Sequence, residues 1–334
     1  MKAVAPGKLI LSGEHAVVYG KPAIAMAIDR SAVFELTPQD GDRISFDLSD
    51  GEAENSFTLK ALRDLKRRVE NKYREFLSGD IGIGYVLSAP ADLFRFAFIN
   101  TLDVLHRQLE SGLVLKLRSS IPMGCGMGSS AATVLSEIRA MGHYLRVDFK
   151  PEWYYEYSLE AEKLQHGKPS GVDSYISLHG GCARFEQGQA RSIALPRMRM
   201  FMVHTGIPES TTGESVMEVE RNFRSSAIWS EFEDVTNAVE DAIRTNNLQK
   251  MHWLIRENNR LLAAIGVVPD KVQQFVADIE RWGGSAKVCG AGAVTGDKGG
   301  IVLVVADRPP TEICRKHGYT VSPVRGDPLG TRMI

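Results

Sequence analysis

The most informative segment of the chain is Pro122-Met-Gly-Cys-Gly-Met-Gly-Ser-Ser-Ala-Ala132, near its middle. Alternating glycines at Gly124, Gly126 and Gly128 remove the Cβ atoms that would keep a ligand away from the backbone. Two serines follow, at the point where a helix start leaves N–H groups free. Free N–H groups and the positive end of a helix together favour an anion, above all a phosphate. The stretch therefore predicts a phosphate-binding loop that leads into a helix.

The flanking residues favour this interpretation over a simple serine-capped turn. Apolar residues at 114–117 predict a strand before the loop, and apolar residues at helical spacing over 135–145 predict an amphipathic helix after it. The loop is not of the Walker A type, because no GxxxxGK[ST] occurs in the chain. It is not a dinucleotide fingerprint either, because Ser129 stands where the third glycine would fall.

Size and composition exclude several classes of protein. The 334 residues fit two lobes or one deeply divided domain, and a net charge of -1 gives no strong field toward nucleic acid or an anionic membrane. The four cysteines form no CxxC pair, so they suggest buried thiols rather than zinc or a dithiol centre. The N-terminus lacks the apolar core of a signal peptide, and the apolar runs are strand-sized. We expect a cytoplasmic protein.

Helical and strand patterns are mixed along the rest of the chain. Helical spacing of apolar residues predicts helices over 62–76, 92–109 and 152–165, and most of 212–282 is expected to be helical. Residues 3–18 are expected to form a strand, a glycine turn and a second apolar stretch. Further strands are expected within 40–57 and 193–204, and at 286–289 and 301–305. This mixture predicts the α+β class. A change of character near residues 180–195 predicts a domain boundary there.

Three segments, in this order, resemble the GHMP kinase superfamily, named for galactokinase, homoserine kinase, mevalonate kinase and phosphomevalonate kinase. They are Ala5–Gly20, the loop at 122–132, and Lys287–Gly292 with the glycines that follow it. The resemblance implies a two-lobed fold with the site in the cleft. Residues 1–188 would form a ribosomal-protein-S5-like lobe with a left-handed βαβ unit, the nucleotide loop and the catalytic segment, and residues 189–334 a ferredoxin-like lobe. The third segment departs from the usual GAGxGG, because residues 293–298 separate its glycines.

Two segments resemble the mevalonate kinases within this superfamily. They are Gly13-Glu-His-Ala-Val-Val-Tyr-Gly20 and Glu162-Lys-Leu-Gln-His-Gly-Lys-Pro-Ser-Gly-Val-Asp173. The resemblance implies ATP-dependent phosphorylation of (R)-mevalonate at the C5 hydroxyl, giving 5-phosphomevalonate for isoprenoid biosynthesis. It further implies ATP as co-substrate, Mg²⁺ as cofactor and a cytoplasmic homodimer, with no nucleic-acid or membrane partner.

The same resemblance assigns two catalytic residues. Asp173 would accept or orient the proton of the substrate hydroxyl, a role that contributes about 10²- to 10⁴-fold to a rate. Lys8 would lie near it and stabilise charge on the moving phosphoryl group. Taken alone, Asp173 could be a turn or capping residue and Lys8 a solvated lysine.

Ser130 and Glu162 would hold Mg²⁺, which prefers hard oxygen donors and keeps several waters. Glu160 lies two residues before Glu162, so on a helix only one of them should face the site. A surface glutamate is the alternative for Glu162. His166 would be structural, in the turn.

The remaining site residues follow from the resemblance as well. Glu14 and His15 would contact the substrate, with His15 donating to its carboxylate, although a histidine beside a strand is often only a structural hydrogen bonder. The nucleotide would lie on Ser119, Gly124, Cys125, Gly126, Met127, Gly128, Ser129 and Ser130.

Two other functions remain open. The chain could be another superfamily kinase or a mevalonate-pathway decarboxylase, although His15 and the segment ending at Asp173 argue against these. It could also be a nucleotide-binding sensor without turnover. Such a sensor should have lost catalytic positions, whereas all four are present: Lys8, Ser130, Glu162 and Asp173.

Overall fold

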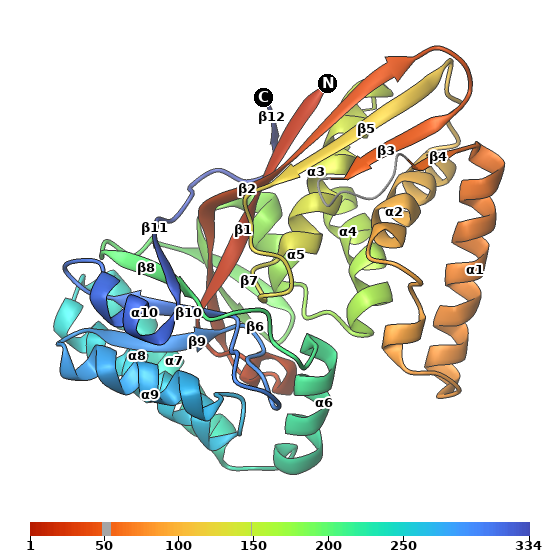
Figure 1. Cartoon of the computed structure of the whole chain (residues 1–334). Coiled ribbons are helices and arrows are strands. Elements are labelled where there is room, and N and C mark those ends of the chain that lie inside the picture. The colour runs from red at the N-terminus through yellow and green to blue at the C-terminus, as the bar shows by residue number, and fades with distance from the viewer. Residues whose placement is uncertain (49–54, 148) are drawn as a thin grey trace.

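The computed structural model describes residues 1–48, 55–147 and 149–334. Two β-sheets, each covered by helices, form its framework (Figure 1). The α+β class predicted from the sequence is confirmed. Of the strands expected within 40–57, two lie at Ile44–Leu48 and Asn55–Phe57, and residues 49–54 lie outside the described part of the chain.

The larger sheet contains eight strands in the order β12-β1-β2-β5-β3-β4, with β6 paired to β2 and β7 to β6. All of its pairs are antiparallel except β3 with β5. Its strands are β1 (Lys2–Ser12), β2 (Ala23–Gln39), β3 (Ile44–Leu48), β4 (Asn55–Phe57), β5 (Gly112–Ser119), β6 (Cys182–Glu186), β7 (Gln189–Ile193) and β12 (Arg332–Met333).

Five α-helices and two short 3₁₀ turns accompany this sheet, with α3 and α5 packed directly on β1 and β2. They are α1 (Leu59–Ser78), α2 (Ala91–Val104), α3 (Ser129–Tyr144), α4 (Pro151–His166), α5 (Val172–His179), η1 (Ala16–Tyr19) and η2 (Ile83–Tyr85). The helices predicted over 62–76 and 152–165 are confirmed. The one predicted over 92–109 ends at Val104, because His106 takes a positive φ of 50° that no α-helix contains.

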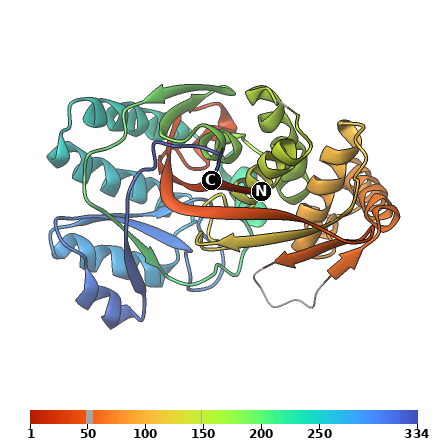
Figure 2. The same cartoon turned by 90° about the horizontal axis from the view of Figure 1, so that it is seen from above.

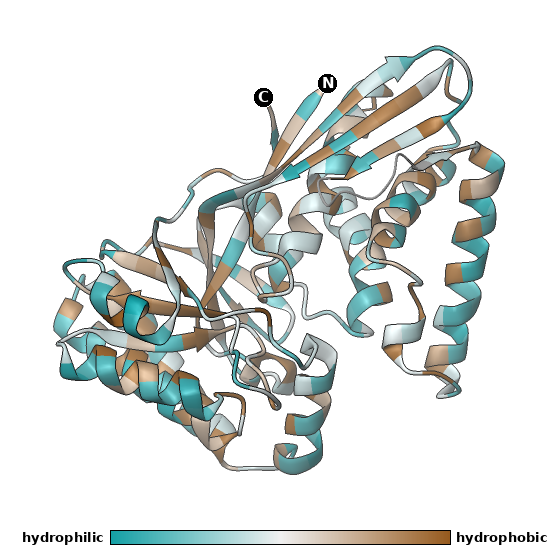
Figure 3. Cartoon of the chain, in the orientation of Figure 1, coloured by the Kyte–Doolittle hydropathy of each residue, from teal (hydrophilic) through white to brown (hydrophobic). Residues whose placement is uncertain are grey.

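The smaller sheet has four antiparallel strands in the order β11-β8-β10-β9. Its strands are β8 (Met200–His204), β9 (Ser285–Cys289), β10 (Ile301–Val305) and β11 (Thr320–Val324). Its helices are α6 (Thr212–Phe223), α7 (Ile228–Arg244), α8 (Leu248–Ala264), α9 (Asp270–Arg281) and α10 (Thr311–His317). In Figure 3 the strands of this sheet are largely hydrophobic, whereas the long helix α1 at the far side of the molecule is largely hydrophilic.

One continuous hydrophobic core joins both sheets and their helices. It includes Phe34 on β2, Leu135 on α3, Phe232 in the helix at 228–244 and Val302 on β10. The chain passes between the sheets after β7, which ends at Ile193. The domain division after residue 188 stays a prediction. Figures 1 and 2 place the two ends of the chain side by side, because β12 pairs with β1. Among the described residues, no helix combines the length and apolarity needed to span a membrane.

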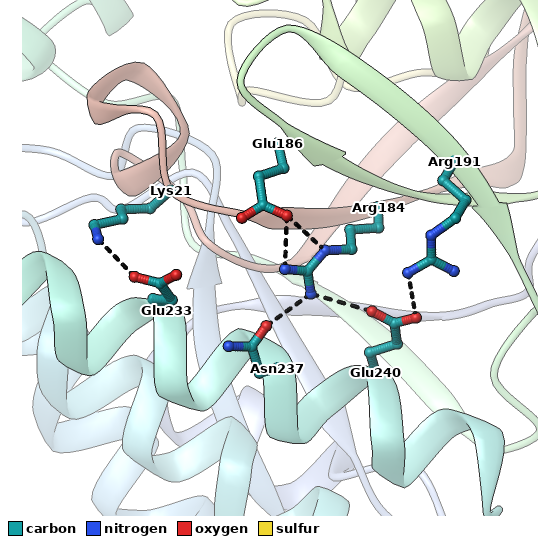
Figure 4. Close-up of polar contacts among 7 residues, drawn as sticks. All are labelled: Lys21, Arg184, Glu186, Arg191, Glu233, Asn237 and Glu240. Carbon is teal, nitrogen blue, oxygen red and sulfur yellow. Dashed lines mark hydrogen bonds and ion pairs between the residues drawn. The ribbon is translucent and has the colours of Figure 1, made fainter.

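Polar contacts fasten helix α7 of the second sheet to strands of the first (Figure 4). Glu233 pairs with Lys21 at 2.5 Å, and Glu240 pairs with Arg184 at 3.1 Å and Arg191 at 2.6 Å. Ion pairs that are this exposed contribute at most about 1 kcal/mol each. These contacts matter mainly for position, since Lys21 lies two residues after η1, the turn that begins after Glu14 and His15.

Candidate active site

The predicted phosphate loop connects β5 to α3, and all three of its alternating glycines have positive φ. The values are 68° at Gly124, 71° at Gly126 and 67° at Gly128. Helix α3 begins at Ser129, and its N-cap is Gly128 in the left-handed conformation, with no side chain capping the first turn. No side-chain cap therefore occupies the N–H groups at this helix start. Free N–H groups at a helix start are the arrangement that binds phosphate.

The first and third glycine motifs both reach this loop. A Cβ added at Gly126 would lie 3.2 Å from the Cα of Gly290, and one added at Gly7 would lie 3.0 Å from the carbonyl oxygen of Met127. Real Cβ atoms rarely come this close to a neighbour, so glycine lets these backbones approach each other. Segments near the start, middle and end of the chain thus meet at one place.

A small hollow opens beside the loop. Its lining residues are Gly124–Gly126, Pro208, Ser210 and Thr212, and, from the third motif, Cys289, Ala291, Gly292 and Gly299. None of these lining residues is charged. An anion placed there would therefore depend on backbone N–H groups and on cations near the rim.

The lengthened third motif still closes on this hollow. The hydroxyl of Thr205 donates to the carbonyl oxygen of Gly300 at 2.9 Å and accepts from the N–H of Gly299 at 3.0 Å. A Cβ added at Gly300 would lie 3.6 Å from the Cα of Cys125. The additional residues 293–298 therefore leave both later glycines next to the phosphate loop.

Lys8 and Asp173 lie together directly behind the loop. The Nζ of Lys8 is 3.1 Å from Oδ1 of Asp173, and the Lys8 side chain is only 4% exposed. A Cβ added at Gly128 would lie 2.9 Å from Cγ of Lys8 and 3.4 Å from Oδ2 of Asp173. The ion pair is thus within van der Waals distance of the loop at its junction with α3.

Two local features bring this pair together. The pairing of β1 with β2 shifts register between Pro6 and Lys8, and the N–H of Lys8 donates to Met127 instead, at 2.9 Å. Such bulges redirect a side chain, often beside an active site. Asp173 lies in the first turn of α5, after the left-handed Gly171. A Cβ at Gly171 would lie 2.1 Å from the hydroxyl of Tyr155, so only glycine fits there.

Glu162 is a buried carboxylate beside the pair, with its side chain 2% exposed. Its pKa is raised to about 8, mainly by burial and further by the charge of Asp173. A hydrogen bond from Ser130 and the charge of Lys8 lower the pKa in part. Its Oε1 has no hydrogen-bond partner among the described residues, and its Oε2 lies 3.5 Å from Nε2 of His166.

This donor set fits a magnesium ion. A hydroxyl and a carboxylate with an unused oxygen stand at the start of α3, where phosphate oxygens would supply further ligands. The neighbouring Glu160 points away, since its side chain is 52% exposed and pairs with Lys163.

Glu14 and His15 lie in the turn between β1 and η1. Glu14 is buried and forms an ion pair with Lys287, and its Oε2 has no hydrogen-bond partner among the described residues. His15 has a φ of 59°, and its Nε2 lies 3.0 Å from the carbonyl oxygen of Ala291. A carbonyl can only accept, so Nε2 carries the proton and Nδ1 is an acceptor. Burial lowers the pKa of His15 to about 4, so the ring is neutral.

The other predicted nucleotide residues surround the loop. Ser119 ends β5, is exposed, and its hydroxyl accepts from the N–H of Ile121 at 3.2 Å. Cys125 is buried with its Sγ 3.3 Å from Nε2 of His204, and burial raises its pKa to about 11. Met127 is buried, and its carbonyl oxygen accepts a hydrogen bond from the backbone N–H of Lys8. The individual roles of these residues stay predictions.

Two residues near the site had no predicted role. Lys287 belongs to the third motif, yet nothing in its local sequence points to Glu14. Thr205 directly follows β8, and spacing in the sequence gives no sign of its contacts with Gly299 and Gly300.

Comparisons with known proteins agree with this geometry. Residues 96–181 match the family described as the GHMP kinases N terminal domain. The chain is 30% identical to the mevalonate kinase of Archaeoglobus fulgidus, over 87% of this chain and 89% of that one. It is 27% identical to the mevalonate kinase of Methanocaldococcus jannaschii, over 90% of each chain. The crystal structure of the Methanococcus jannaschii mevalonate kinase superposes with a TM-score of 0.82 at 25% identity, covering 98% of both chains. The chain has the two-lobed GHMP kinase fold and belongs to the mevalonate kinase family.

Proposed function

We propose that this protein transfers the γ-phosphoryl group of ATP to the C5 hydroxyl of (R)-mevalonate, giving 5-phosphomevalonate, ADP and a proton. Family membership supports the reaction class, and the name shared by the relatives supports the substrate. One observation carries the proposal. The buried ammonium of Lys8 and the carboxylate of Asp173 are 3.1 Å apart, directly behind a glycine loop at a helix start.

The roles of this pair follow from what phosphoryl transfer requires. Little covalent work falls to the protein, which must align the reactants and balance charge. Asp173 is 29% exposed, so an alcohol can reach it, and its carboxylate orients the hydroxyl and takes its proton. Lys8 is held rigidly by strand β1 and by its contact with Met127, so its charge needs no reorganisation during the transfer.

The loop at 124–130 cradles the phosphates of ATP. Its glycines allow the backbone to approach closely, and the start of α3 contributes the positive end of the helix dipole. Ser119 lies at the entrance to this loop and is proposed to border the nucleotide.

Ser130 and Glu162 would hold the magnesium ion, which neutralises phosphate charge when it is bound. The unpartnered Oε1 of Glu162 supports this assignment, since a buried carboxylate oxygen without a donor is costly. A cation beside Glu162 would also keep that carboxylate ionised.

Glu14 and His15 are proposed to bind mevalonate. Both present an unpartnered buried acceptor, Oε2 of Glu14 and Nδ1 of His15. Acceptors match hydroxyl groups, so this structure favours contacts from His15 to a hydroxyl of mevalonate. A contact from His15 to the carboxylate, as expected from the sequence, would require the other tautomer.

A coupled assay of ADP release tests the function, with mevalonate, phosphomevalonate, galactose and homoserine offered in parallel. We expect turnover with mevalonate and a product heavier by one phosphoryl group. Turnover with one of the other three alone would reject the substrate and keep the reaction class. Tight ATP binding with no turnover on any of them would indicate a sensor. The homodimeric state and cytoplasmic location implied by the resemblance stay predictions, and light scattering would measure the first.

A further inference from the structure

Lys287 is a fully buried lysine to which the phosphoryl chemistry gives no role. It lies in the middle of β9, and its side chain is 0% exposed. Its Nζ pairs with the carboxylate of Glu14 and donates to the carbonyl oxygen of Ile10 at 3.2 Å. A buried ammonium group is costly unless it is paired and hydrogen-bonded, and here it is both. The pair joins the second sheet to the turn after β1.

The partner carboxylate is held by one oxygen only. Oε1 of Glu14 takes the contact with Lys287, and Oε2 is buried without a hydrogen-bond partner among the described residues. The side chain is therefore fixed in direction while one acceptor remains available. Glu14 directly precedes His15, whose positive φ makes this turn a strained segment that needs outside support.

Two further contacts tie the same turn to the end of β9. Nε2 of His15 donates to Ala291, and Sγ of Cys289 lies 3.6 Å from the carbonyl oxygen of Ile10. All three contacts come from the segment 287–291, the third glycine motif. The residues that approach the phosphate loop at Gly290 thus also hold the turn that carries Glu14.

We propose that Lys287 is a positioning residue for substrate binding, which holds the carboxylate of Glu14 so that Oε2 accepts a hydrogen bond from a hydroxyl of the substrate. Lys287 itself touches no substrate. The inference rests on the proposed function for the identity of that substrate. The third motif would then both pack against the phosphate loop and position Glu14 for substrate binding.

The ionisation of Glu14 gives this role a distinctive signature. Burial raises the pKa of Glu14, and the charges of Lys287 and Lys8 oppose that rise. Without Lys287 the pKa would rise further, because burial remains while the opposing charge is lost. The adjacent His15 and Cys289 have pKa values of about 4 and about 11.

The test is Lys287→Met in the full-length chain, assayed with mevalonate and ATP. We expect KM for mevalonate to rise by about tenfold or more, since a buried acceptor loses its partner, while KM for ATP stays within about twofold. The rise in KM should shrink as the pH increases, because a larger fraction of Glu14 is then ionised. Lys287→Arg, which keeps the charge, should restore the KM of the wild type.

A matched control separates this role from simple loss of a buried ion pair. Arg95 and Asp92 pair at 3.0 Å within α2, and both side chains are under 10% exposed. Arg95→Met should lower the melting temperature without a pH-dependent change in KM for mevalonate.

A double-mutant cycle with Glu14→Gln completes the test. If Lys287 acts through Glu14, adding Lys287→Met to Glu14→Gln should change KM for mevalonate by less than about twofold. This double variant buries no unpaired charge, so KM can still be measured on it if Lys287→Met alone does not fold. An unchanged KM in Lys287→Met, an equal rise for ATP, or additive effects in the cycle would overturn the inference. A wild type inactive on mevalonate would instead overturn the proposed function.

Discussion

Replacement of Asp173 by asparagine removes the proposed base while keeping the shape of the side chain. The amide oxygen of asparagine can still accept from Lys8, whose Nζ lies 3.1 Å from Oδ1 in the native pair. The nucleotide loop, the start of α3 and the pair Ser130–Glu162 are left in place. The variant therefore separates proton acceptance from ATP binding.

The magnitude follows from the two roles of the carboxylate. Loss of a general base costs about 10²- to 10⁴-fold in kcat. At about 1.4 kcal/mol for each tenfold change, that is about 3 to 5 kcal/mol of barrier. The stability cost should be smaller, about 1 to 3 kcal/mol, since Lys8 is 4% exposed and keeps a neutral acceptor. A chain of this size would lose about 2 to 4 °C in Tm for each kcal/mol.

Three measurements on one preparation check this reasoning: kcat by ADP release, Kd for ATP by calorimetry, and Tm. Asp103→Asn is the matched control, because Asp103 is 27% exposed and is likewise ion-paired, with Arg63 at 3.0 Å, but lies in α2. It should keep kcat within about twofold. A kcat for Asp173→Asn within about fivefold of the wild type would refute the role of base, and an equal loss of ATP binding would make the residue structural.

Three further variants or treatments probe the loop and the metal site. Gly128→Ala should lower kcat/KM for ATP, because the new Cβ would lie 2.9 Å from Cγ of Lys8 and because a φ of 67° costs alanine about 1 to 2 kcal/mol. Gly20→Ala is the control, since its φ is 75° and nothing lies within 4 Å of the new Cβ. It should lower stability through backbone strain alone and leave activity unchanged. Glu162→Gln should raise the Mg²⁺ concentration needed for half-maximal activity by at least about tenfold, and an unchanged titration would remove this residue from the metal site. Cys125 should resist iodoacetamide near neutral pH, as mass spectrometry would show, because burial raises its pKa to about 11 and the thiolate is scarce; rapid alkylation would contradict its burial.

Local patterns in the sequence were sufficient to predict several elements. Leu62, Leu65 and Val69 recur at helical spacing, and all three are buried on one side of α1. The alternating glycines at 124–128 adopt the positive φ values that glycine allows most readily. These features depend on residues within a few positions of one another, which is the range over which spacing is informative.

Contacts between distant segments did not follow from spacing. Lys8 and Asp173 lie 165 positions apart, and only the resemblance to a family suggested that they meet. The pair of Lys287 with Glu14 was missed, because a lysine in an apolar strand does not reveal its partner 273 positions away. The expected donor role of His15 stays a prediction, and spacing gave no sign of the carbonyl oxygen of Ala291, which the folded chain brings to 3.0 Å from Nε2.

The pairing of β12 with β1 has a consequence for biosynthesis. Ala3 is matched with Met333, and the N–H of Ile334 donates to the carbonyl oxygen of Lys2. Lys8 is synthesised long before residues 332–333, and the outer edge of its strand stays open until those residues have emerged from the ribosome. Chains still being translated should therefore expose that edge to other nascent chains, and stalling before residue 332 should favour misassembly.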